Sequence, residues 1–356
     1  MNAPLLKPRI RVRAESLSDP ESCRRLDSFV AAQPGSEFFH RPQWSRAVER
    51  GCGQKSHFLV AEDQSGALAG CLPLTEIRSF LFGNALVSAG FGTGGGILAS
   101  DGAAVEALAE AAWALARSLG CGSVELRGGA LPEGWQRREG VYASFSTGLP
   151  DDPESLLAGL TKRQRYEVRK ALGRGLEVSA GNDERHVDGF YRVYRECVRN
   201  LGTPVFPAAL FEAMADEYGE DCDVLIVWKD GRPVAANFNL YHGGTGQCHW
   251  GGGTAEAKGC RANDVMMYAQ MRHLAERGCT RADFGRSKLG TGPYERKRCW
   301  HLDERPLVYA VRTAEGSAAR DVNPLSPKYR LQVELWKRLP LPVANFVGPP
   351  IARGLG

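Results

Sequence analysis

Two separated stretches of the chain share one pattern, and this repeat constrains the fold more than any other feature. Residues 59–70 and 225–236 each have the pattern of a strand, a polar turn containing Asp and Gly, and a second strand. A helical pattern and a further strand follow each of them. The pair Asp230-Gly231 is a strong hairpin signal, because both residue types tolerate the backbone angles of a tight turn. Two copies of one α/β unit therefore explain a chain of 356 residues better than one large domain does.

Apolar periodicity predicts the other elements of each unit. In the first half, helices are expected at 20–32, 42–50 and 102–119, and strands at 10–14, 57–62, 68–75 and 123–127. In the second half, helices are expected at 160–172, 183–200, 208–218 and 261–277, and strands at 224–228, 233–240, 246–250 and 281–284. The polar run 149–153 contains two prolines and marks a boundary.

The predicted fold class is therefore α/β (α+β), with units at 1–150 and 151–315 and a helical, proline-rich tail at 316–356. In the tail, a helix is expected at 324–338, and the apolar run 339–351 contains too many prolines for a regular helix.

The stretch 282–300 concentrates the residues best suited to chemistry. A strand ending at Asp283 and Phe284 is expected to break into a loop punctuated by glycines, which let a ligand approach the main chain closely. The loop brings together Arg286, Lys288, Tyr294, Arg296, Lys297 and Arg298. A cationic, glycine-rich loop after a strand is a common place for anionic ligands in α/β proteins. A solvated basic loop would have the same composition.

The order of residues in this stretch resembles the FemAB-like transferases, which carry a D-F-G-R-S run, then G-T-G-x-Y, and a lysine close behind. Here the run is 283–287, followed by Gly290-Thr-Gly-Pro-Tyr294 and Lys297. The stretches 200–207 (NLGTPVFP) and 258–264 (KGCRAND) also fit. The resemblance is strong over 160–306 and is closest to the FemAB-related proteins associated with PEP-CTERM/exosortase and exopolysaccharide systems. Where that family often has F-K-K after the tyrosine, this chain has E-R-K-R.

The resemblance implies tandem acetyltransferase-like (GNAT) units and an acyl- or aminoacyltransferase acting on an amine or hydroxyl of a cell-envelope or exopolysaccharide precursor. It also places Lys297 in the active cleft. Acyl transfer needs donors aimed at the developing oxyanion and a group that positions or deprotonates the nucleophile. Lys297, Arg286 and Tyr294 supply donors, Asp283 supplies a carboxylate, and Lys288 joins Arg286 in the expected substrate site. The alternative role for Asp283 is to cap the turn or to pair with Arg286.

A second candidate anion site lies at 258–264, before a predicted helix. In GNAT acetyltransferases a glycine-rich turn that opens a helix presents N–H groups to the pyrophosphate of coenzyme A. That frame is EAKGCR here, at 256–261, and it departs from the family pattern at both ends. Arg261 and Asn263 resemble the FemAB version instead and are expected to bind substrate. Helix capping is the alternative, and the donor stays open between acyl-CoA and aminoacyl-tRNA.

The third candidate is the basic helix at 161–174, in which six cationic side chains accompany one acid, Glu167. Lys162, Arg165 and Arg169 share a face, while Val168 and Leu172 are expected on the buried side. Such a stripe suggests a phosphate-rich ligand, such as a tRNA acceptor end, a lipid pyrophosphate or a nucleotide sugar. A solvated helix face is the alternative.

Composition argues against several other classes. A net charge of +4 is too small for a general nucleic-acid binder, and no DNA-reading helix is apparent. The ten cysteines are scattered without a C-x-x-C pair, which argues against a disulfide framework or a zinc knuckle. His242 and His249 have no carboxylate at ligand spacing, so no metal is expected. The glycine run 92–96 lacks the G-K-[ST] of a phosphate loop.

The chain shows neither a signal-peptide core nor an apolar run long enough to span a bilayer, so a cytoplasmic protein is expected. In the tail, Leu331, Leu335 and Trp336 share a face beside basic residues, as in a helix that lies on a membrane surface. Peripheral contact with the inner membrane is one reading of this tail, and a strap packed on the two units is the other.

No Ser or Cys nucleophile motif is present, which fits direct transfer without a covalent enzyme intermediate. The alternative function is a non-catalytic GNAT-like scaffold that docks membrane-bound polysaccharide or exosortase machinery through the tail.

Overall fold

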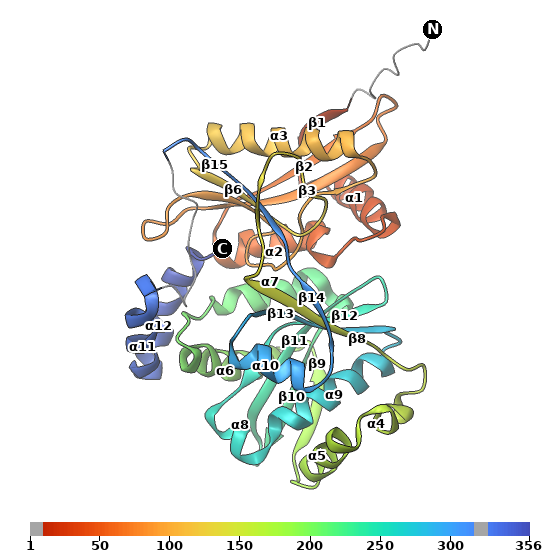
Figure 1. The fold of residues 1–356 in the computed structure, drawn as a ribbon, viewed down its shortest axis with the longest axis vertical. Helices are drawn as coiled ribbons and strands as arrows, with labels where there is room; N and C mark the ends of the chain where they lie inside the picture. Colours follow the sequence, from red (N-terminus) through yellow and green to blue (C-terminus); the bar gives the residue numbers. More distant parts are fainter. Residues whose placement is uncertain (1–9, 317–326) are drawn as a thin grey trace. The chain divides into compact units, whose positions relative to one another are not determined.

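The computed structural model describes residues 10–316 and 327–356 and divides the chain into two compact units (Figure 1). Unit 1 contains the residues up to Glu139, a return segment that begins at Leu307, and the last residues from Arg353. Unit 2 contains Gly140–Pro306 and the tail helices before Arg353. Each unit is a mixed sheet with helices packed on its faces, so the α/β prediction is confirmed.

Unit 1 is built on a sheet with the strand order β1-β2-β3-β4-β6-β15-β7, and β5 pairs with β3. Its strands are β1 (Arg11–Glu15), β2 (Ser56–Glu62), β3 (Leu68–Ile77), β4 (Ala85–Ser88), β5 (Leu98–Ala99), β6 (Ser123–Arg127), β7 (Gln136–Arg138) and β15 (Tyr309–Thr313). Its helices are α1 (Pro20–Ala32), α2 (Pro42–Cys52) and α3 (Gly102–Ser118), with a 3-10 turn η1 (Phe38–His40). Side chains of β2 alternate between two cores: Leu59 and Ala61 pack with α3, and Phe58 and Val60 pack with α1.

Unit 2 is built on a sheet with the strand order β14-β8-β13-β12-β11-β10-β9. Its strands are β8 (Tyr142–Gly148), β9 (Glu177–Gly181), β10 (Cys222–Lys229), β11 (Arg232–His242), β12 (Thr245–Gly253), β13 (Arg281–Lys288) and β14 (Asp303–Pro306). Its helical elements before the tail are η2 (Pro153–Ser155), α4 (Leu156–Gly159), α5 (Lys162–Leu172), α6 (Glu184–Leu201), α7 (Ala208–Tyr218), η3 (Gly219–Asp221), α8 (Ala255–Cys260), α9 (Ala262–Glu276) and α10 (Gly292–Cys299).

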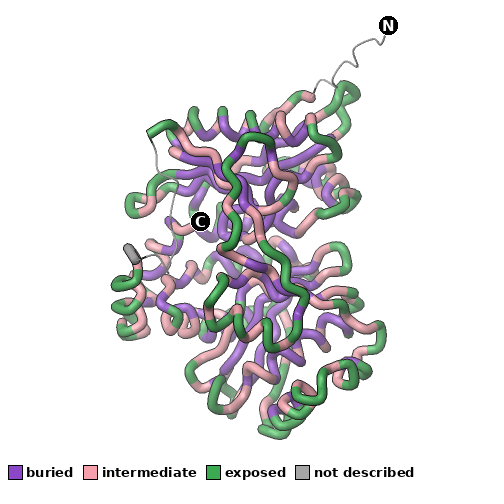
Figure 2. The backbone as a smooth tube through the Cα atoms, viewed as in Figure 1, coloured by how far each residue is buried: buried purple, intermediate pink, exposed green. Residues whose placement is uncertain are grey.

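Helices cover both faces of the unit 2 sheet. On one face, Met271 and Leu274 of α9 pack in a core with Ala282 and Phe284 of β13. A second core, made of aromatic rings, joins α6 and α7 to the sheet: the ring of Phe211 lies 4.9 Å from that of Phe190 and 5.1 Å from that of Trp250. Figure 2 shows the central strands buried and α5 mostly exposed.

The boundary between the units differs from the expected division near residue 150. Strand β8 belongs to unit 2, because it pairs with β13 from Arg281↔Gly148 to Lys288↔Tyr142. Strand β15, which the sequence pattern did not predict and whose residues were assigned to the second unit, belongs to unit 1 and pairs with β6. The predicted hairpin at 225–236 is confirmed, since β10 and β11 pair through Lys229↔Arg232 next to the Asp-Gly turn.

The tail forms two helices, α11 (Pro327–Arg338) and α12 (Leu341–Arg353). The start of the helix expected at 324–338 lies outside the described residues, and the prediction that 339–351 is irregular is wrong. Pro342 lies in the first turn, where an N–H has no intrahelical partner to lose. Pro349 and Pro350 interrupt only the last part of α12. Helix α11 packs on α6, where Arg199 donates a hydrogen bond of 3.2 Å to the Lys337 carbonyl.

Candidate active site

The central feature of unit 2 is the divergence of two parallel strands, β12 and β13. They pair at Thr245↔Arg281, Gly246↔Ala282 and Gln247↔Asp283, and no pairing follows among the described residues. Beyond this point β12 stays beside β11 and β13 stays beside β8. Main-chain groups on facing strand edges that no longer pair can hydrogen-bond an extended ligand.

A bulge at Gly285 lies next to the point where β12 and β13 diverge. The register between β13 and β8 shifts between Asp283 and Arg286, and Gly285 has a φ of 66°. A Cβ at Gly285 would lie 3.1 Å from the carbonyl oxygen of Cys248 on β12, so glycine also permits a close approach of the two strands. The long loop expected after Phe284 is wrong: β13 continues to Lys288, and α10 begins at Gly292 with Pro293 in its first turn.

Lys297, on α10, points its ammonium group at this bulge. The Nζ donates to the carbonyls of Phe284 at 2.5 Å and Gly285 at 3.0 Å, and it lies 3.5 Å from that of Arg286. It also lies 5.7 Å from the centre of the Phe145 ring. Burial lowers the pKa of Lys297 from its ordinary value to about 8. The structure thus places a desolvated cation where β12 and β13 separate.

Asp283 is the last β13 residue before the strands separate. Its Oδ1 accepts a hydrogen bond of 2.6 Å from the N–H of Gly285, so the carboxylate supports the bulge. Burial raises the pKa of Asp283, while this N–H, the Gln247 side chain and the charge of Lys297 act in the opposite direction. Asp283 and Lys297 therefore interact electrostatically. Asp283 therefore caps the turn, as the alternative predicted, and its catalytic role stays a prediction.

Tyr294 and Lys297 contact the same ring, but the Tyr294 hydroxyl is engaged elsewhere. Its ring packs edge-on against Phe145 at 5.5 Å, and its hydroxyl donates a hydrogen bond of 2.8 Å to Glu304. This hydrogen bond raises the pKa of Tyr294. Tyr294 thus fixes α10 against β8 and β14, and its expected catalytic role stays a prediction.

Arg286 and Lys288 occupy the part of β13 beyond the bulge. The Arg286 guanidinium lies 4.4 Å from the centre of the Tyr142 ring on β8, and both basic side chains are partly buried. Between them, Ser287 is 5% exposed, and its hydroxyl has no hydrogen-bond partner in the part of the chain that the structure describes. A buried hydroxyl without a partner is a candidate ligand contact.

Arg261 directly precedes a long helix, as expected. It has a φ of 65° and separates the short α8 from α9, which begins at Ala262. Its guanidinium pairs with Glu167 of α5 and with Asp264 at 3.3 Å, and Arg296 of α10 reaches the same Asp264 at 2.9 Å. These ion pairs link three helices, so Arg261 and Arg296 are already neutralised within unit 2.

Asn263 lies close to the end of β12. A Cβ at Gly253 would lie 2.5 Å from its Oδ1, so the absence of a side chain at Gly253 makes room for Asn263. The asparagine is partly buried, and its expected contact with substrate stays a prediction.

The basic helix α5 packs on α9 and has an exposed cationic face. Lys162 and Arg169 are exposed, whereas Arg165 donates a hydrogen bond of 3.0 Å to the Ala158 carbonyl. Leu172 is 44% exposed, so its expected burial is wrong. Ala171 is buried beside Val168 instead, because their spacing of three residues matches the face that meets α9.

The glycine run 92–96 of unit 1 forms hydrogen bonds with side chains of its own unit. Strands β4 and β6 form a parallel pair at Leu86↔Val124 and Val87↔Glu125, comparable to β12 and β13. In the segment after β4, Arg127 donates to the Gly92 carbonyl at 2.8 Å, and Glu37 accepts from the Gly95 N–H at 2.9 Å. The Glu37 carboxylate would repel a phosphate. This loop is structural, and the candidate site lies in unit 2.

The histidines and cysteines give no sign of a metal site. Within residues 10–316 and 327–356, no group of three or more His, Cys, Asp or Glu side chains could hold a metal ion. The Nδ1 of His249 hydrogen-bonds the Gln247 side chain at 3.2 Å. Burial raises the pKa of Cys248 to about 12, so this thiol stays protonated at neutral pH and is a poor nucleophile.

Three residues near Lys297 were not predicted: Phe145, Gln247 and Cys248. Gln247 and Cys248 lie beside His249, in a stretch that was considered only as a possible metal site because of its histidines. Phe145 is fully buried on β8, a strand that the sequence pattern did not predict. Strand pairing alone brings these residues to the site.

Known proteins share the fold of this chain. Residues 160–298 match the model of the Acetyltransferase (GNAT) domain. A crystal structure of FemX superposes with a TM-score of 0.64 at 15% identity, covering 84% of this chain and 96% of its own. A tandem GNAT protein from the clavulanic acid biosynthesis pathway gives 0.54 at 10% identity, covering 87% and 100%.

The C-terminal domain (DUF2156) of a protein from Agrobacterium fabrum, described as a lysylphosphatidylglycerol synthetase, gives a TM-score of 0.55 at 14% identity, covering 84% of this chain and 93% of its own. No curated protein sequence matches the chain. At these identities the structural likeness concerns the fold. The chain therefore has a fold of two tandem GNAT-like units, similar to that of FemX, and residues 160–298 of its second unit match the GNAT domain model.

Proposed function

We propose that this protein is an acyl- or aminoacyltransferase that moves an activated acyl group directly to an amine or hydroxyl of a cell-envelope or exopolysaccharide precursor. The carrying observation is Lys297, whose desolvated ammonium group lies against the Phe284 and Gly285 carbonyls where β12 and β13 separate. The GNAT domain match supports transfer. The likeness to FemX and to a lysylphosphatidylglycerol synthetase domain supports an envelope precursor as acceptor. The link to exosortase systems is part of this proposal and rests on sequence resemblance alone.

The donor would lie along the separated edges of β12 and β13. An extended arm containing amides, such as that of acyl-CoA, can pair with main-chain groups there in the manner of an added strand. The ion pairs of Arg261 argue against coenzyme A as the donor. Arg261 already pairs with Glu167 and Asp264 at the helix junction where a pyrophosphate would be expected. Aminoacyl-tRNA is therefore the other donor to test.

Each side chain then has a distinct role in the step. The acceptor amine or hydroxyl attacks the donor carbonyl, a bond to the acceptor forms, and the bond to the donor's leaving group breaks. Asp283 accepts the proton of the acceptor and can return it to the leaving group. Lys297 donates to the oxyanion, where a preorganised cation in a desolvated site is most effective. Neither role requires a covalent intermediate on Cys248.

A donor panel tests the proposal. Purified protein is incubated with acyl-CoA, charged tRNA and nucleotide sugars, and both the melting temperature and donor consumption are measured. A true donor raises the melting temperature, because it binds only the folded state, and it is consumed when an acceptor amine is added. Stabilisation by a donor without any consumption would favour the non-catalytic scaffold instead.

The pH dependence of transfer should be bell-shaped. Transfer should increase as Asp283 loses its proton, and the acidic limb should lie above the ordinary aspartate range because burial raises the Asp283 pKa. It should decrease as pH rises through about 8, where Lys297 loses the charge that stabilises the oxyanion. Lys297→Arg should remove the alkaline limb, because arginine stays charged. A rate that keeps increasing above pH 8 would instead make the neutral amine a base.

The tail should bring the protein to anionic membrane surfaces. Among the described helices none is long and apolar enough to cross a membrane. Leu331 is 71% exposed and Phe346 83% exposed, even though α11 packs on α6. Full-length protein should therefore float with phosphatidylglycerol liposomes, and a chain truncated after Asn323 should not. Leu331→Ser with Phe346→Ser is the control that keeps both helices. Equal flotation of all three proteins would exclude a membrane-binding role for the tail and favour the alternative that it is a strap packed on the two units.

A further inference from the structure

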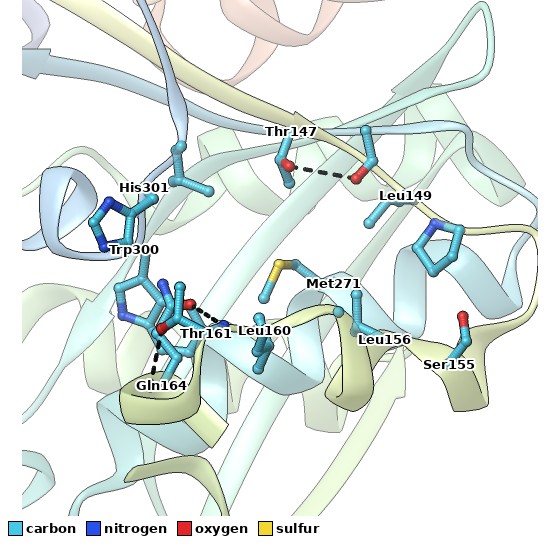
Figure 3. Close-up of a pocket in the computed structure, with 14 residues that line it drawn as sticks. Thr147, Leu149, Ser155, Leu156, Leu160, Thr161, Gln164, Met271, Trp300 and His301 are labelled. Atoms are coloured by element: carbon cyan, nitrogen blue, oxygen red, sulfur yellow. Dashed lines mark hydrogen bonds between the residues drawn. The ribbon is translucent and has the colours of Figure 1, made fainter. Parts of the chain in front are cut away.

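Unit 2 contains a pocket of about 500 Å³ that does not include Lys297 or Asp283 (Figure 3). It lies between the end of β8, the η2–α4–α5 segment, α9 and the residues after α10. Its apolar lining consists of Leu149, Leu156, Leu160, Met271, Trp300 and Leu302. This volume is within the range of roughly 300–1,000 Å³ that is typical of small-molecule sites.

Two polar residues of the pocket, Thr161 and Gln164, lie where α5 begins. Thr161 and Gln164 form a capping box: Thr161 Oγ1 accepts from the Gln164 N–H at 3.3 Å, and Gln164 Oε1 accepts from the Thr161 N–H at 3.0 Å. This arrangement leaves the Gln164 Nε2 buried, with no hydrogen-bond partner within the described residues. Because Gln164 lines the pocket, this unpartnered amide lies beside the space that a ligand would occupy.

Charge is distributed unequally around the pocket. Next to Thr161 the first turn of α5 carries Lys162 and Arg163, which are exposed, and the only acid of this helix, Glu167, is already paired with Arg261. Near the opposite rim, Asp152 caps η2 and Glu154 pairs with Arg272. An anionic group would therefore bind at the α5 end, where the N–H groups of the helix terminus also favour it.

The pocket is connected to the candidate active site through α10. Trp300 lines the pocket and donates its backbone N–H to the Lys297 carbonyl at 3.1 Å. His301, the next lining residue, has a φ of 55°, an uncommon conformation for a residue other than glycine. A ligand in the pocket would thus contact the segment that directly follows the helix of Lys297.

We propose that this pocket binds the apolar chain of a phosphate or pyrophosphate ester, with the phosphate held by Gln164 and the basic first turn of α5. The apolar lining accounts for the chain, and the buried amide of Gln164 and the exposed cations Lys162 and Arg163 account for the phosphate. Binding is a property of the pocket itself. That the bound molecule is the lipid carrier of the acceptor rests on the proposed transferase function.

The test uses full-length protein and three probes: farnesyl phosphate, farnesol and inorganic pyrophosphate. Trp300 lines the pocket, so tryptophan emission should change on binding, and calorimetry gives the affinity. Farnesyl phosphate should bind at least about tenfold more tightly than farnesol or pyrophosphate, since each of these lacks one half of the interaction. Its binding should weaken as salt increases, and Lys162→Ala/Arg163→Ala should weaken it further.

Two glycine variants separate the pocket from the rest of the surface. A Cβ at Gly159 or at Gly102 meets nothing within 4 Å, so both positions accept a side chain, but only Gly159 lines the pocket. Gly159→Leu should lose farnesyl phosphate binding by about tenfold or more, and Gly102→Leu should bind as the parent does. If Gly159→Leu does not fold, Met271→Trp fills the same space from α9.

Three results would overturn the proposal: unchanged binding by both pocket-filling variants, equal affinity for farnesol, or equal affinity for pyrophosphate. Unchanged binding by both variants would show that the ligand does not occupy the pocket. Equal affinity for farnesol would show that the phosphate is not recognised, and equal affinity for pyrophosphate would show that the apolar chain is not. Lys297→Ala should bind farnesyl phosphate normally. Loss of transfer in that variant with retained binding distinguishes failure of catalysis from failure of the pocket.

Discussion

Lys297→Ala is expected to lower the rate of acyl transfer by about 10²–10³-fold, the loss typical of removing one oxyanion donor. The melting temperature should change little. Removing Lys297 leaves the Phe284 and Gly285 carbonyls without this donor, but it also removes a cation whose lowered pKa shows that its charge is poorly solvated. These effects on stability oppose one another. Turnover with the donor identified by the panel, measured beside thermal melting, checks both expectations.

Arg298→Ala is the matched control on the same helix. Arg298 is exposed and its ion pairs with Glu295 and Glu304, at 3.7 and 3.9 Å, are long, so its loss should leave turnover close to that of the parent. Lys297→Met adds a side chain of similar length without charge. If Lys297→Ala and Lys297→Met turn over donor at the parental rate and melt normally, Lys297 only fills space beside the bulge and has no catalytic role.

The sequence predicted the fold well where local pattern and pairing agree. The hairpin around Asp230-Gly231 joins neighbouring strands, so turn chemistry and alternation are enough to find it. Strands β8 and β15 depend instead on partners far along the chain: β8 pairs with β13, and β15 leaves unit 2 to pair with β6. No local pattern records such long-range pairing, so β8 was not predicted and the unit boundary was expected near residue 150 instead of after Glu139.

The site could be predicted in its residues but not in its geometry. The order Asp283 to Ser287, with Lys297 behind it, identified the segment through resemblance. Which atoms meet depends on the bulge at Gly285, which points the Phe284 and Gly285 carbonyls at Lys297. For Arg261 the sequence predicted a cation that binds substrate. In the structure, the packing of α5 on α9 brings Glu167 to Arg261, and the two side chains form an ion pair.

Gly285→Ala is expected to lower both stability and transfer more than Gly290→Ala does. Both glycines have a positive φ, 66° at Gly285 and 73° at Gly290, so alanine adds backbone strain of about 1–3 kcal/mol at either position. Only at Gly285 would the new Cβ also approach the Cys248 carbonyl, at 3.1 Å, whereas at Gly290 it meets nothing within 4 Å. The comparison therefore separates strain from the close approach of β12 and β13.

Transfer should be lost at Gly285 because the bulge sets two things at once. It presents the carbonyls that hold Lys297, and it fixes the point where β12 and β13 separate. A methyl group there displaces the β12 backbone or flattens the bulge, and either change moves the ammonium relative to the donor carbonyl. A small misplacement of a catalytic group can cost about 10²-fold in rate. Turnover and melting of the two variants give the answer: equal losses of transfer would mean that the strand divergence does not position Lys297.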